Sequence, residues 1–245
     1  MYRILMLALF TCVVAHATAQ VNFVKNPSFE EYYKCPDDAD QIAYSKFWSN
    51  ILDTVFNPTS FKQSEYFNRC ALGSHIRASL PENNVFYQDA RTGNGMAGCA
   101  FYFDKTSSPV PPVPNYREYL NGRLHTVLQA GKTYCVSFFL NLMETSGYAQ
   151  NKIGAYLDDG SIHKLSIPVG SEVTTLIPQV YTSDVISDTM NWVKFEGSFV
   201  ASGYETYITI GTFFKNADVT ANVVPYFGAF NQYTYYLIDE LVLYQ

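Results

Sequence analysis

The stretch at residues 134–142 reads YCVSFFLNL, and large apolar residues recur at every second position along it. Successive side chains of a β-strand point to opposite faces of the sheet, so a period of two predicts a strand with one apolar face. The apolar row consists of Tyr134, Val136, Phe138, Leu140 and Leu142. We therefore expect this stretch to be a core strand.

The same alternation continues outward from this stretch in both directions along the chain. It recurs at residues 193–199 and 206–210, and the other strand candidates are residues 22–25, 97–103, 124–128, 153–157 and 235–243. Turn sequences containing glycine separate these runs, at residues 92–95, 130–132, 158–160 and 201–203. Eight or more short strands with this spacing predict an all-β sandwich, with short helices expected only at residues 41–48 and 115–124.

Length and charge narrow the domain count and the classes of partner. The 245 residues suit one domain, which we expect at residues 20–245. The 20 Tyr and 18 Phe residues supply enough large side chains for one hydrophobic core. The net charge is −6, and the 16 Lys and Arg residues are scattered without forming a basic run. Such a chain is not expected to bind nucleic acid.

The first nineteen residues have the pattern of a secretory signal peptide. Arg3 precedes an apolar run of about a dozen residues, and Ala17 and Ala19 form an Ala-x-Ala cleavage site. After Gln20 no run of 18 apolar residues follows, so we expect no transmembrane anchor. The mature chain is therefore predicted to be secreted, to the periplasm, the outer cell surface or the extracellular space.

Cleavage after Ala19 leaves four cysteines, an even number that suggests disulfides in an oxidising compartment. We expect Cys35 to pair with Cys70, because both lie in polar, loop-like sequence. Cys99 and Cys135 lie in apolar, strand-like runs, and they either pair across strands or remain thiols.

The two ends of the mature chain carry a candidate metal site. Residues 26–30 read NPSFE and residues 235–243 read YYLIDELVL. With strict alternation, Asp239 points the same way as Leu237, Leu241 and Leu243, and a carboxylate facing a core needs a compensating cation or hydrogen bonds. If the terminal strands are neighbours, Glu30 meets Asp239 there, and two carboxylates with loop carbonyls suit Ca²⁺. In the alternative interpretation, Asp239 only caps backbone N–H groups.

These terminal motifs resemble the first and last strands of galactose-binding-like jelly rolls, the fold of many carbohydrate-binding modules. The chain is also similar to a secreted bacterial family of such domains over nearly its whole mature length. The matching segments are residues 29–30 with 35–38, 66–70, 90–98, 116–119, 128–138, 153–156 and 192–197. The resemblance implies a jelly-roll β-sandwich in which Glu30 and Asp239 hold a structural Ca²⁺. Glu240 departs from the usual second Asp of the closing motif.

Carbohydrate binding needs flat aromatic faces and a few polar side chains. Trp48 and Trp192 are expected to pack in the fold rather than to bind sugar. The candidate ligand-binding residues are the loop aromatics Tyr226, Phe227, Phe230 and Tyr233, together with Tyr116 and Arg117. The alternative for Arg117 is a structural ion pair.

The chain lacks the usual hydrolase, metalloprotease, P-loop and dinucleotide-binding motifs. The adjacent carboxylates Asp37-Asp38 and Asp158-Asp159 lie in turn sequences, where turn formation explains them better than glycoside hydrolysis. We therefore expect no enzyme but a secreted, non-catalytic glycan-binding protein. The alternative is a structural or adhesive protein of the cell surface that contacts other surface proteins.

Overall fold

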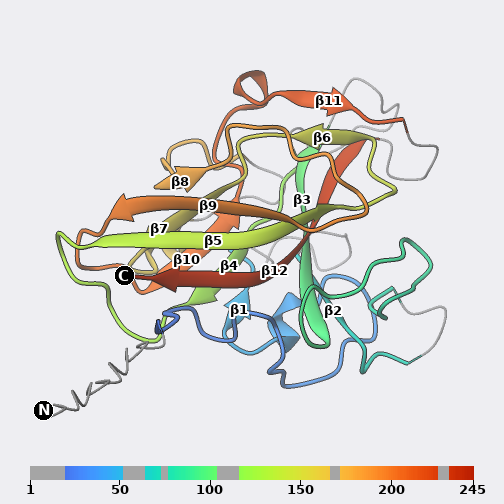
Figure 1. The fold of residues 1–245 in the computed structure, drawn as a ribbon, viewed down its shortest axis with the longest axis horizontal. Coiled ribbons are helices and arrows are strands. Elements are labelled where there is room, and N and C mark those ends of the chain that lie inside the picture. The colour runs from blue at the N-terminus through green and yellow to red at the C-terminus, as the bar shows by residue number, and fades with distance from the viewer. Residues whose placement is uncertain (1–19, 52–63, 73–76, 104–115, 166–171, 226–231) are drawn as a thin grey trace, which may run out of the picture.

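The computed structural model describes residues 20–51, 64–72, 77–103, 116–165, 172–225 and 232–245, and in these ranges the chain forms two facing antiparallel sheets (Figure 1). The expected signal peptide at residues 1–19 and the proline-rich stretch at 109–114 lie outside these ranges. Within them, no helix is long and apolar enough to cross a membrane.

The first sheet, here called the β12 sheet, has the strand order β2-β3-β12-β5-β9. Its strands are β2 (Glu65–Asn68), β3 (Gly95–Phe103), β12 (Tyr233–Tyr244), β5 (Thr133–Leu142) and β9 (Val193–Val200). The central strand β12 pairs with β3 on one side and with β5 on the other, antiparallel in both cases.

The second sheet, here called the β10 sheet, has the order β1-β4-β10-β7-β8. Its strands are β1 (Trp48–Ser49), β4 (Leu120–Arg123), β10 (Tyr207–Gly211), β7 (Gly154–Asp158) and β8 (Val180–Tyr181). A separate antiparallel pair is formed by β6 (Tyr148–Gln150) and β11 (Ala221–Val223). Three 3₁₀ turns are described as well, at Ile42–Tyr44, Ser161–Lys164 and Asn216–Asp218.

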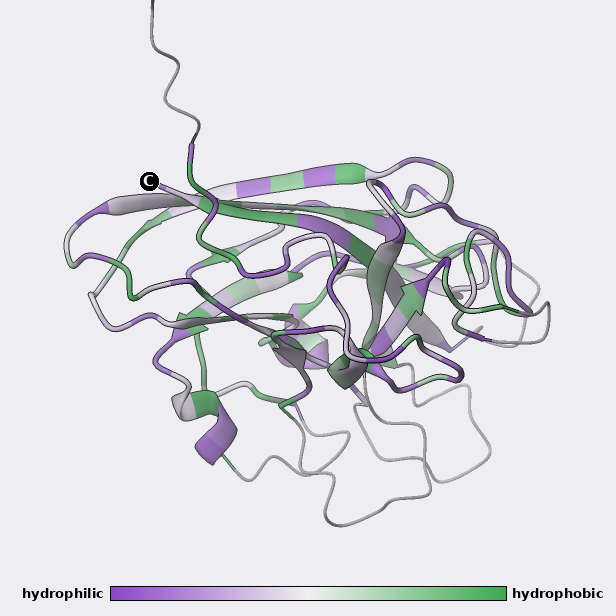
Figure 2. Ribbon diagram, turned by 90° about the horizontal axis from the view of Figure 1, so that it is seen from below, coloured by the Kyte–Doolittle hydropathy of each residue, from purple (hydrophilic) through white to green (hydrophobic). Residues whose placement is uncertain are grey.

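From β3 to β12 the longer strands alternate between the two sheets, in the order β3, β4, β5, β7, β9, β10 and β12. This repeated crossing confirms the expected jelly-roll β-sandwich. Hydrophobic and hydrophilic residues alternate along β9 (Figure 2), as a strand at the edge of the sheet with one face toward solvent requires.

The core between the sheets is built from the predicted apolar rows. All five residues of the predicted apolar row of β5 are buried there, and Ile208 and Ile210 of β10 face them. Trp48 is also buried, with its indole N–H donating to the carbonyl of Asn26 at 2.9 Å. Trp192 packs against a second apolar cluster on the far side of the β12 sheet, here called the outer cluster. Its buried members are Phe67, Leu80, Phe86, Met96, Ala100, Met143, Tyr235 and Leu237. Both tryptophans therefore pack in the fold, as expected.

Several local predictions were wrong or incomplete. The helix expected at residues 115–124 is absent from its described part, because that segment ends in strand β4 paired with β10. The helix expected at 41–48 is reduced to the 3₁₀ turn Ile42–Tyr44. Residues 124–128 form no strand, and residues 22–25 contribute only an isolated bridge between Val24 and Leu124. The turns are confirmed, since positive φ angles occur at Gly93, Gly131, Gly160 and Gly203.

Strand β12 also corrects the predicted direction of Asp239. The pairing register with β5 shifts between Asp239 and Val242, and Glu240 has a φ of 56°. This bulge reverses the alternation, so Leu241 and Leu243 face the inter-sheet core whereas Leu237 belongs to the outer cluster. Asp239, paired with Phe139, shares a face with Leu237 but not with the other two leucines. It is nevertheless completely buried.

Candidate functional site

The backbone at residues 26–30 has an unusual conformation. Asn26 and Phe29 both have left-handed φ angles, 49° and 60°, which are costly for a residue as bulky as Phe. Burial compensates at Phe29, whose ring packs against Trp48 at 4.8 Å between centroids. The amide of Asn26 donates to the carbonyls of Glu31 and Lys46. The motif is therefore a folded corner that directs Glu30 toward the next turn.

The turn at residues 92–95 is held by both candidate metal ligands. Glu30 Oε1 accepts hydrogen bonds from the backbone N–H groups of Asn94 (2.8 Å) and Gly95 (2.9 Å). Asp239 Oδ2 accepts one from the N–H of Thr92 at 3.0 Å. The segment at residues 26–30 also lies beside the last strand, since the N–H of Leu241 donates to the carbonyl of Pro27 at 3.0 Å. The structure thus brings Glu30 and Asp239 to one turn.

Two carboxylates, those of Glu30 and Asp239, lie at this turn and are the candidate ligands for a cation. Burial raises the pKa of Asp239 to about 7, and the groups that donate to its carboxylate are backbone N–H groups. A bound cation would keep this buried carboxylate ionised, and carboxylate oxygens are the ligands that Ca²⁺ prefers. The same hydrogen bonds are those that the capping interpretation predicts.

Two aromatic segments that are far apart in sequence meet at the end of β12. Tyr233 packs edge-to-face against Tyr116, with ring centroids 5.9 Å apart, and against Phe103 at 4.7 Å. Tyr116 and Tyr233 are each half-buried. The other predicted platform residues, Tyr226, Phe227 and Phe230, lie outside the described residues. One member of each predicted aromatic cluster therefore belongs to the same surface.

Next to these rings lies a carboxyl cluster that the sequence did not predict. One carboxylate oxygen each of Asp40, Glu65 and Glu118 lie within 4.8 Å of one another. The hydroxyl of Tyr116 donates to Glu118, and that of Tyr235 donates to Glu65. We call this group of five residues the tyrosine–carboxyl cluster.

Burial controls the charge of this cluster. Burial raises the pKa of Glu118 to about 8, although the N–H of Ala100 donates to its Oε2 at 2.8 Å. The pKa of Glu65 is raised well above its ordinary value by burial and by the neighbouring Glu118. The three carboxyls come from residues 25 or more apart in the chain, so no local motif marks them. Of the three carboxyls, only Glu118 lies in a segment that the sequence singled out, residues 116–119.

Arg117 is a structural residue in this geometry. Its side chain is fully buried, and its guanidinium donates to the carbonyl of Thr212 at 2.7 Å and to Asn216 Oδ1 at 2.5 Å. It also forms an ion pair with Glu172 at 3.3 Å. The structure thus favours the ion-pair alternative for Arg117, while the adjacent Tyr116 stays at the candidate surface.

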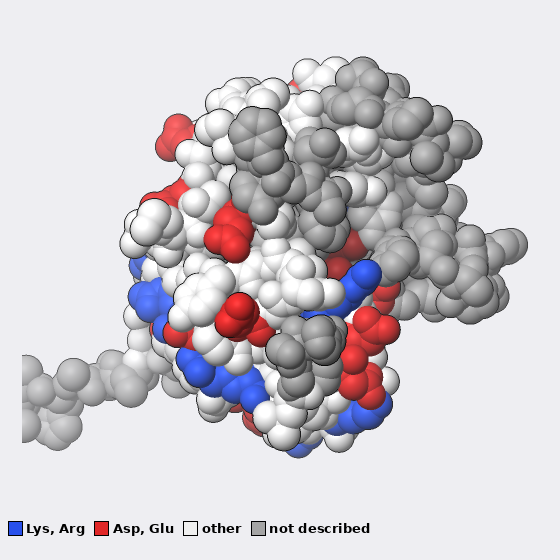
Figure 3. Space-filling view, turned by 90° about the vertical axis from the view of Figure 1, so that its right-hand side faces the viewer, with Lys and Arg blue, Asp and Glu red and all other residues white. Residues whose placement is uncertain are grey.

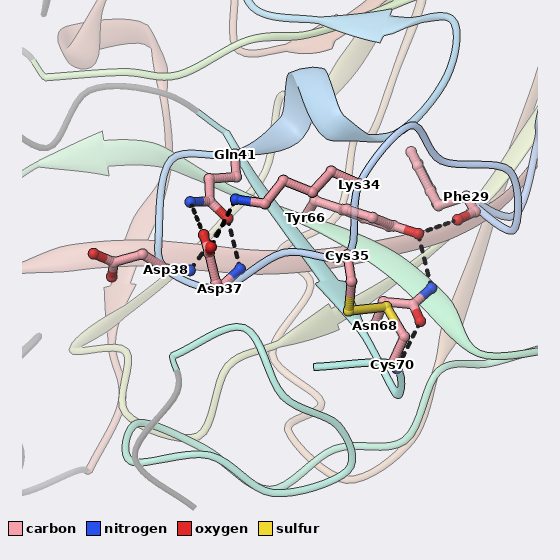
Figure 4. The surroundings of a disulfide bond; sticks show 9 residues. All are labelled: Phe29, Lys34, Cys35, Asp37, Asp38, Gln41, Tyr66, Asn68 and Cys70. Atoms are coloured by element: carbon pink, nitrogen blue, oxygen red, sulfur yellow. Dashed lines mark hydrogen bonds and ion pairs between the residues drawn. A yellow bond between two sulfur atoms is a disulfide. The ribbon is translucent and has the colours of Figure 1, made fainter. Parts of the chain in front are cut away.

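The disulfide between Cys35 and Cys70 is confirmed, with 5.9 Å between the two Cα atoms (Figure 4). Cys99 and Cys135 are both free thiols, which resolves the alternative left open by the sequence. Strand β12 separates the strands that carry them, and Cys99 faces the inter-sheet core.

The adjacent carboxylates that the sequence offered for glycoside hydrolysis form hydrogen bonds within turns and loops instead. Asp158 Oδ2 accepts from the N–H of Ile162 at 2.7 Å, and Asp159 accepts from the N–H of Ser161. Asp37 binds Lys34 and Gln41 near the disulfide (Figure 4). On the face shown in Figure 3, basic and acidic side chains are interspersed without a continuous basic patch.

No protein-family model matches the chain, and no curated protein matches it in sequence. Among solved structures, the chain is similar to the K1 cleaved adhesin domain of Lys-gingipain from Porphyromonas gingivalis W83. The two share 10% identity with a TM-score of 0.40, covering 81% of this chain and 90% of that one.

The chain is similar as well to a tandem CBM22 domain of Xyn10C from Paenibacillus barcinonensis, with 12% identity and a TM-score of 0.43, over 94% of this chain and 48% of that one. A third similar structure is TmCBM61 in complex with β-1,4-galactotriose, with 11% identity and a TM-score of 0.33, over 92% of this chain and 99% of that one. Carbohydrate-binding modules and an adhesin domain are thus among the solved structures to which this chain is similar.

Proposed function

We propose that this protein is a secreted, non-catalytic glycan-binding protein of the cell envelope or the extracellular space. The observation that supports this proposal is the meeting of Tyr116 and Tyr233, two half-buried rings from distant segments, at the end of β12. Sugar rings stack their C–H faces on aromatic side chains. The disulfide supports an oxidising compartment.

The test is binding of the oxidised chain at residues 20–245 to a glycan array, followed by calorimetry on the best ligand. We expect Tyr233→Ala to weaken binding about tenfold, because one stacking ring contributes about 0.5–1.5 kcal/mol beyond its buried area. Tyr204→Ala is the matched control, since Tyr204 is 53% exposed and lies in the turn before β10. The affinity of the Tyr204→Ala variant for the glycan should equal that of the wild type.

Failure to bind any glycan, or equal losses in both variants, contradicts the proposal. Oligomers without sugar affinity in size-exclusion chromatography would instead support the structural or adhesive alternative. Release of sugar products from a polysaccharide panel would identify an enzyme and overturn the non-catalytic part.

We further propose that Glu30 and Asp239 bind a structural Ca²⁺ at the turn of residues 92–95. A ligand that binds only the folded state stabilises that state and so raises the unfolding midpoint. The added stability is about 2.7 kcal/mol at a ligand concentration 100 times its Kd. The midpoint should therefore rise by several degrees between excess EDTA and millimolar Ca²⁺.

Asp239→Asn should abolish this calcium-dependent shift. The control is Asp158→Asn, which removes another buried carboxylate that accepts a hydrogen bond from a backbone N–H group, that of Ile162. That variant should lower the midpoint in both buffers and keep the shift. A wild-type midpoint unchanged by Ca²⁺ leaves Asp239 as a capping residue.

A further inference from the structure

A series of hydrogen bonds connects Cys70 of the disulfide with Phe29 in the folded corner at residues 26–30 (Figure 4). The N–H of Cys70 donates to Asn68 Oδ1 at 2.9 Å, and Asn68 Nδ2 donates to the hydroxyl of Tyr66 at 2.7 Å. That hydroxyl donates to the carbonyl of Phe29 at 2.8 Å. Tyr66 and Asn68 are both buried, so water does not compete for these bonds.

This series ends directly beside Glu30. The carbonyl of Phe29 belongs to the peptide group that joins Phe29 to Glu30, and Phe29 has the costly φ of 60°. Glu30 in turn accepts from the N–H groups of Asn94 and Gly95. The hydrogen bond from Tyr66 therefore fixes the peptide group that precedes the Cα atom of Glu30, and with it the position from which the Glu30 side chain extends.

A second connection ties the same elements together. Asn68 of β2 is the register partner of Gly95 in β3, and the N–H of Arg69 donates to the carbonyl of Asn94 at 2.9 Å. A Cβ atom at Gly95 would lie only 2.5 Å from the carbonyl oxygen of Phe29 and 3.1 Å from Asn68 Nδ2. The Phe29 carbonyl thus lies against both the tyrosine hydroxyl and the turn that Glu30 binds.

We propose that Tyr66 and Asn68, anchored by the Cys35–Cys70 disulfide, are positioning residues that hold Glu30 on the turn at residues 92–95. In this arrangement they set the cation affinity of the Glu30–Asp239 site. The positioning role is independent of glycan binding, and it rests on the proposed calcium site only for the affinity readout.

The first test is site-resolved amide hydrogen exchange in Tyr66→Phe, which keeps the ring and removes only the hydroxyl. We expect about tenfold faster exchange at Asn94 and Gly95, the size of one lost hydrogen bond. Thr92, whose N–H is bound by Asp239, should be unchanged. The double variant Cys35→Ala/Cys70→Ala should accelerate the same two amides.

The matched control is Tyr119→Phe. The hydroxyl of this buried tyrosine also donates to a backbone carbonyl, that of Thr212, and accepts a hydrogen bond, from the N–H of Val173. It should leave Asn94 and Gly95 as protected as in the wild type. Unchanged exchange at these amides in Tyr66→Phe, or an equal rise in the control, overturns the positioning role.

The second test is calcium titration of the same proteins. We expect about tenfold weaker Ca²⁺ binding in Tyr66→Phe and wild-type affinity in Tyr119→Phe. Equal affinities in both variants overturn the link to the cation site. Absence of Ca²⁺ binding in the wild type overturns the calcium proposal itself, whereas the exchange result still decides whether these residues position Glu30.

Discussion

Gly95 occupies a position where only a hydrogen atom fits. The carbonyl oxygen of Phe29 and the side-chain amide of Asn68 lie close to the Cα atom of Gly95, and the N–H of Gly95 donates to Glu30. Any side chain there must push the corner at residues 26–30 away from the start of β3. The close approach explains why a glycine opens this strand.

We expect Gly95→Ala to lower the free energy of unfolding by about 1–3 kcal/mol, the usual cost of an overpacked site. The control is Gly131→Ala, because Gly131 has a φ of 74° but no atom within 4 Å of an added Cβ. That variant should lose only about 1 kcal/mol, from backbone strain alone. Urea unfolding of both variants measures the difference. A smaller loss in Gly95→Ala than in the control would show that the corner yields easily.

At the scale of elements, β12 organises the molecule. It is the central strand of its sheet, its end near Tyr233 lies at the candidate glycan surface, and its bulge places Asp239 at the candidate metal site. The alternation of residues 235–243 predicted the strand, but a bulge has no periodic signal of its own. For this reason the direction of Asp239 relative to Leu241 was predicted wrongly, although its burial was predicted correctly.

The packing of β12 can be tested at Ile238, which is fully buried between the sheets. Ile238→Ala should lower the free energy of unfolding by about 2–5 kcal/mol, since it removes buried methyl groups and leaves a cavity. Val200→Ala at the exposed end of β9, where the side chain is 63% exposed, should change it by no more than about 0.5 kcal/mol. Comparable losses in the two variants, measured by urea unfolding, would contradict the burial of β12.

At the scale of the whole molecule, the tyrosine–carboxyl cluster joins segments that only the complete fold brings together. It combines the loop before β1, strand β2, the segment before β4 and strand β12. Its buried carboxyls hold their protons to higher pH than they would in the unfolded chain. The stability of the protein must therefore depend on pH.

The direction of this dependence follows from Glu118. Its pKa is about 8 in the folded protein, against an ordinary value of 4.5. Below about pH 4.5 the group is protonated in both states, and its contribution to stability is fully present. As the pH rises toward 8, only the folded protein keeps the proton, so the free energy of unfolding falls.

Denaturant unfolding in EDTA between pH 4 and pH 9 should show this decline. Glu118→Gln, which is neutral at every pH, should make the decline shallower and raise the stability at pH 8. Asp239→Asn is a useful comparison, because the raised pKa of Asp239 contributes a separate decline from another part of the molecule. An equally steep decline in Glu118→Gln would show that Glu118 is not the responsible group.

The sequence by itself determined the all-β class, most long strands, the glycine turns and the Cys35–Cys70 disulfide, because strand periodicity and turn chemistry are local properties of the chain. It also indicated Asp239 as a candidate metal ligand, since a carboxylate in an apolar strand is conspicuous, and Glu30 as its neighbour if the terminal strands meet. Only the tertiary structure decided the short strands β1, β2 and β4, the direction of Asp239, the internal role of Arg117 and the meeting of Asp40, Glu65 and Glu118. These features depend on contacts between segments that are distant in sequence, where burial and pairing with a partner strand outweigh local propensity.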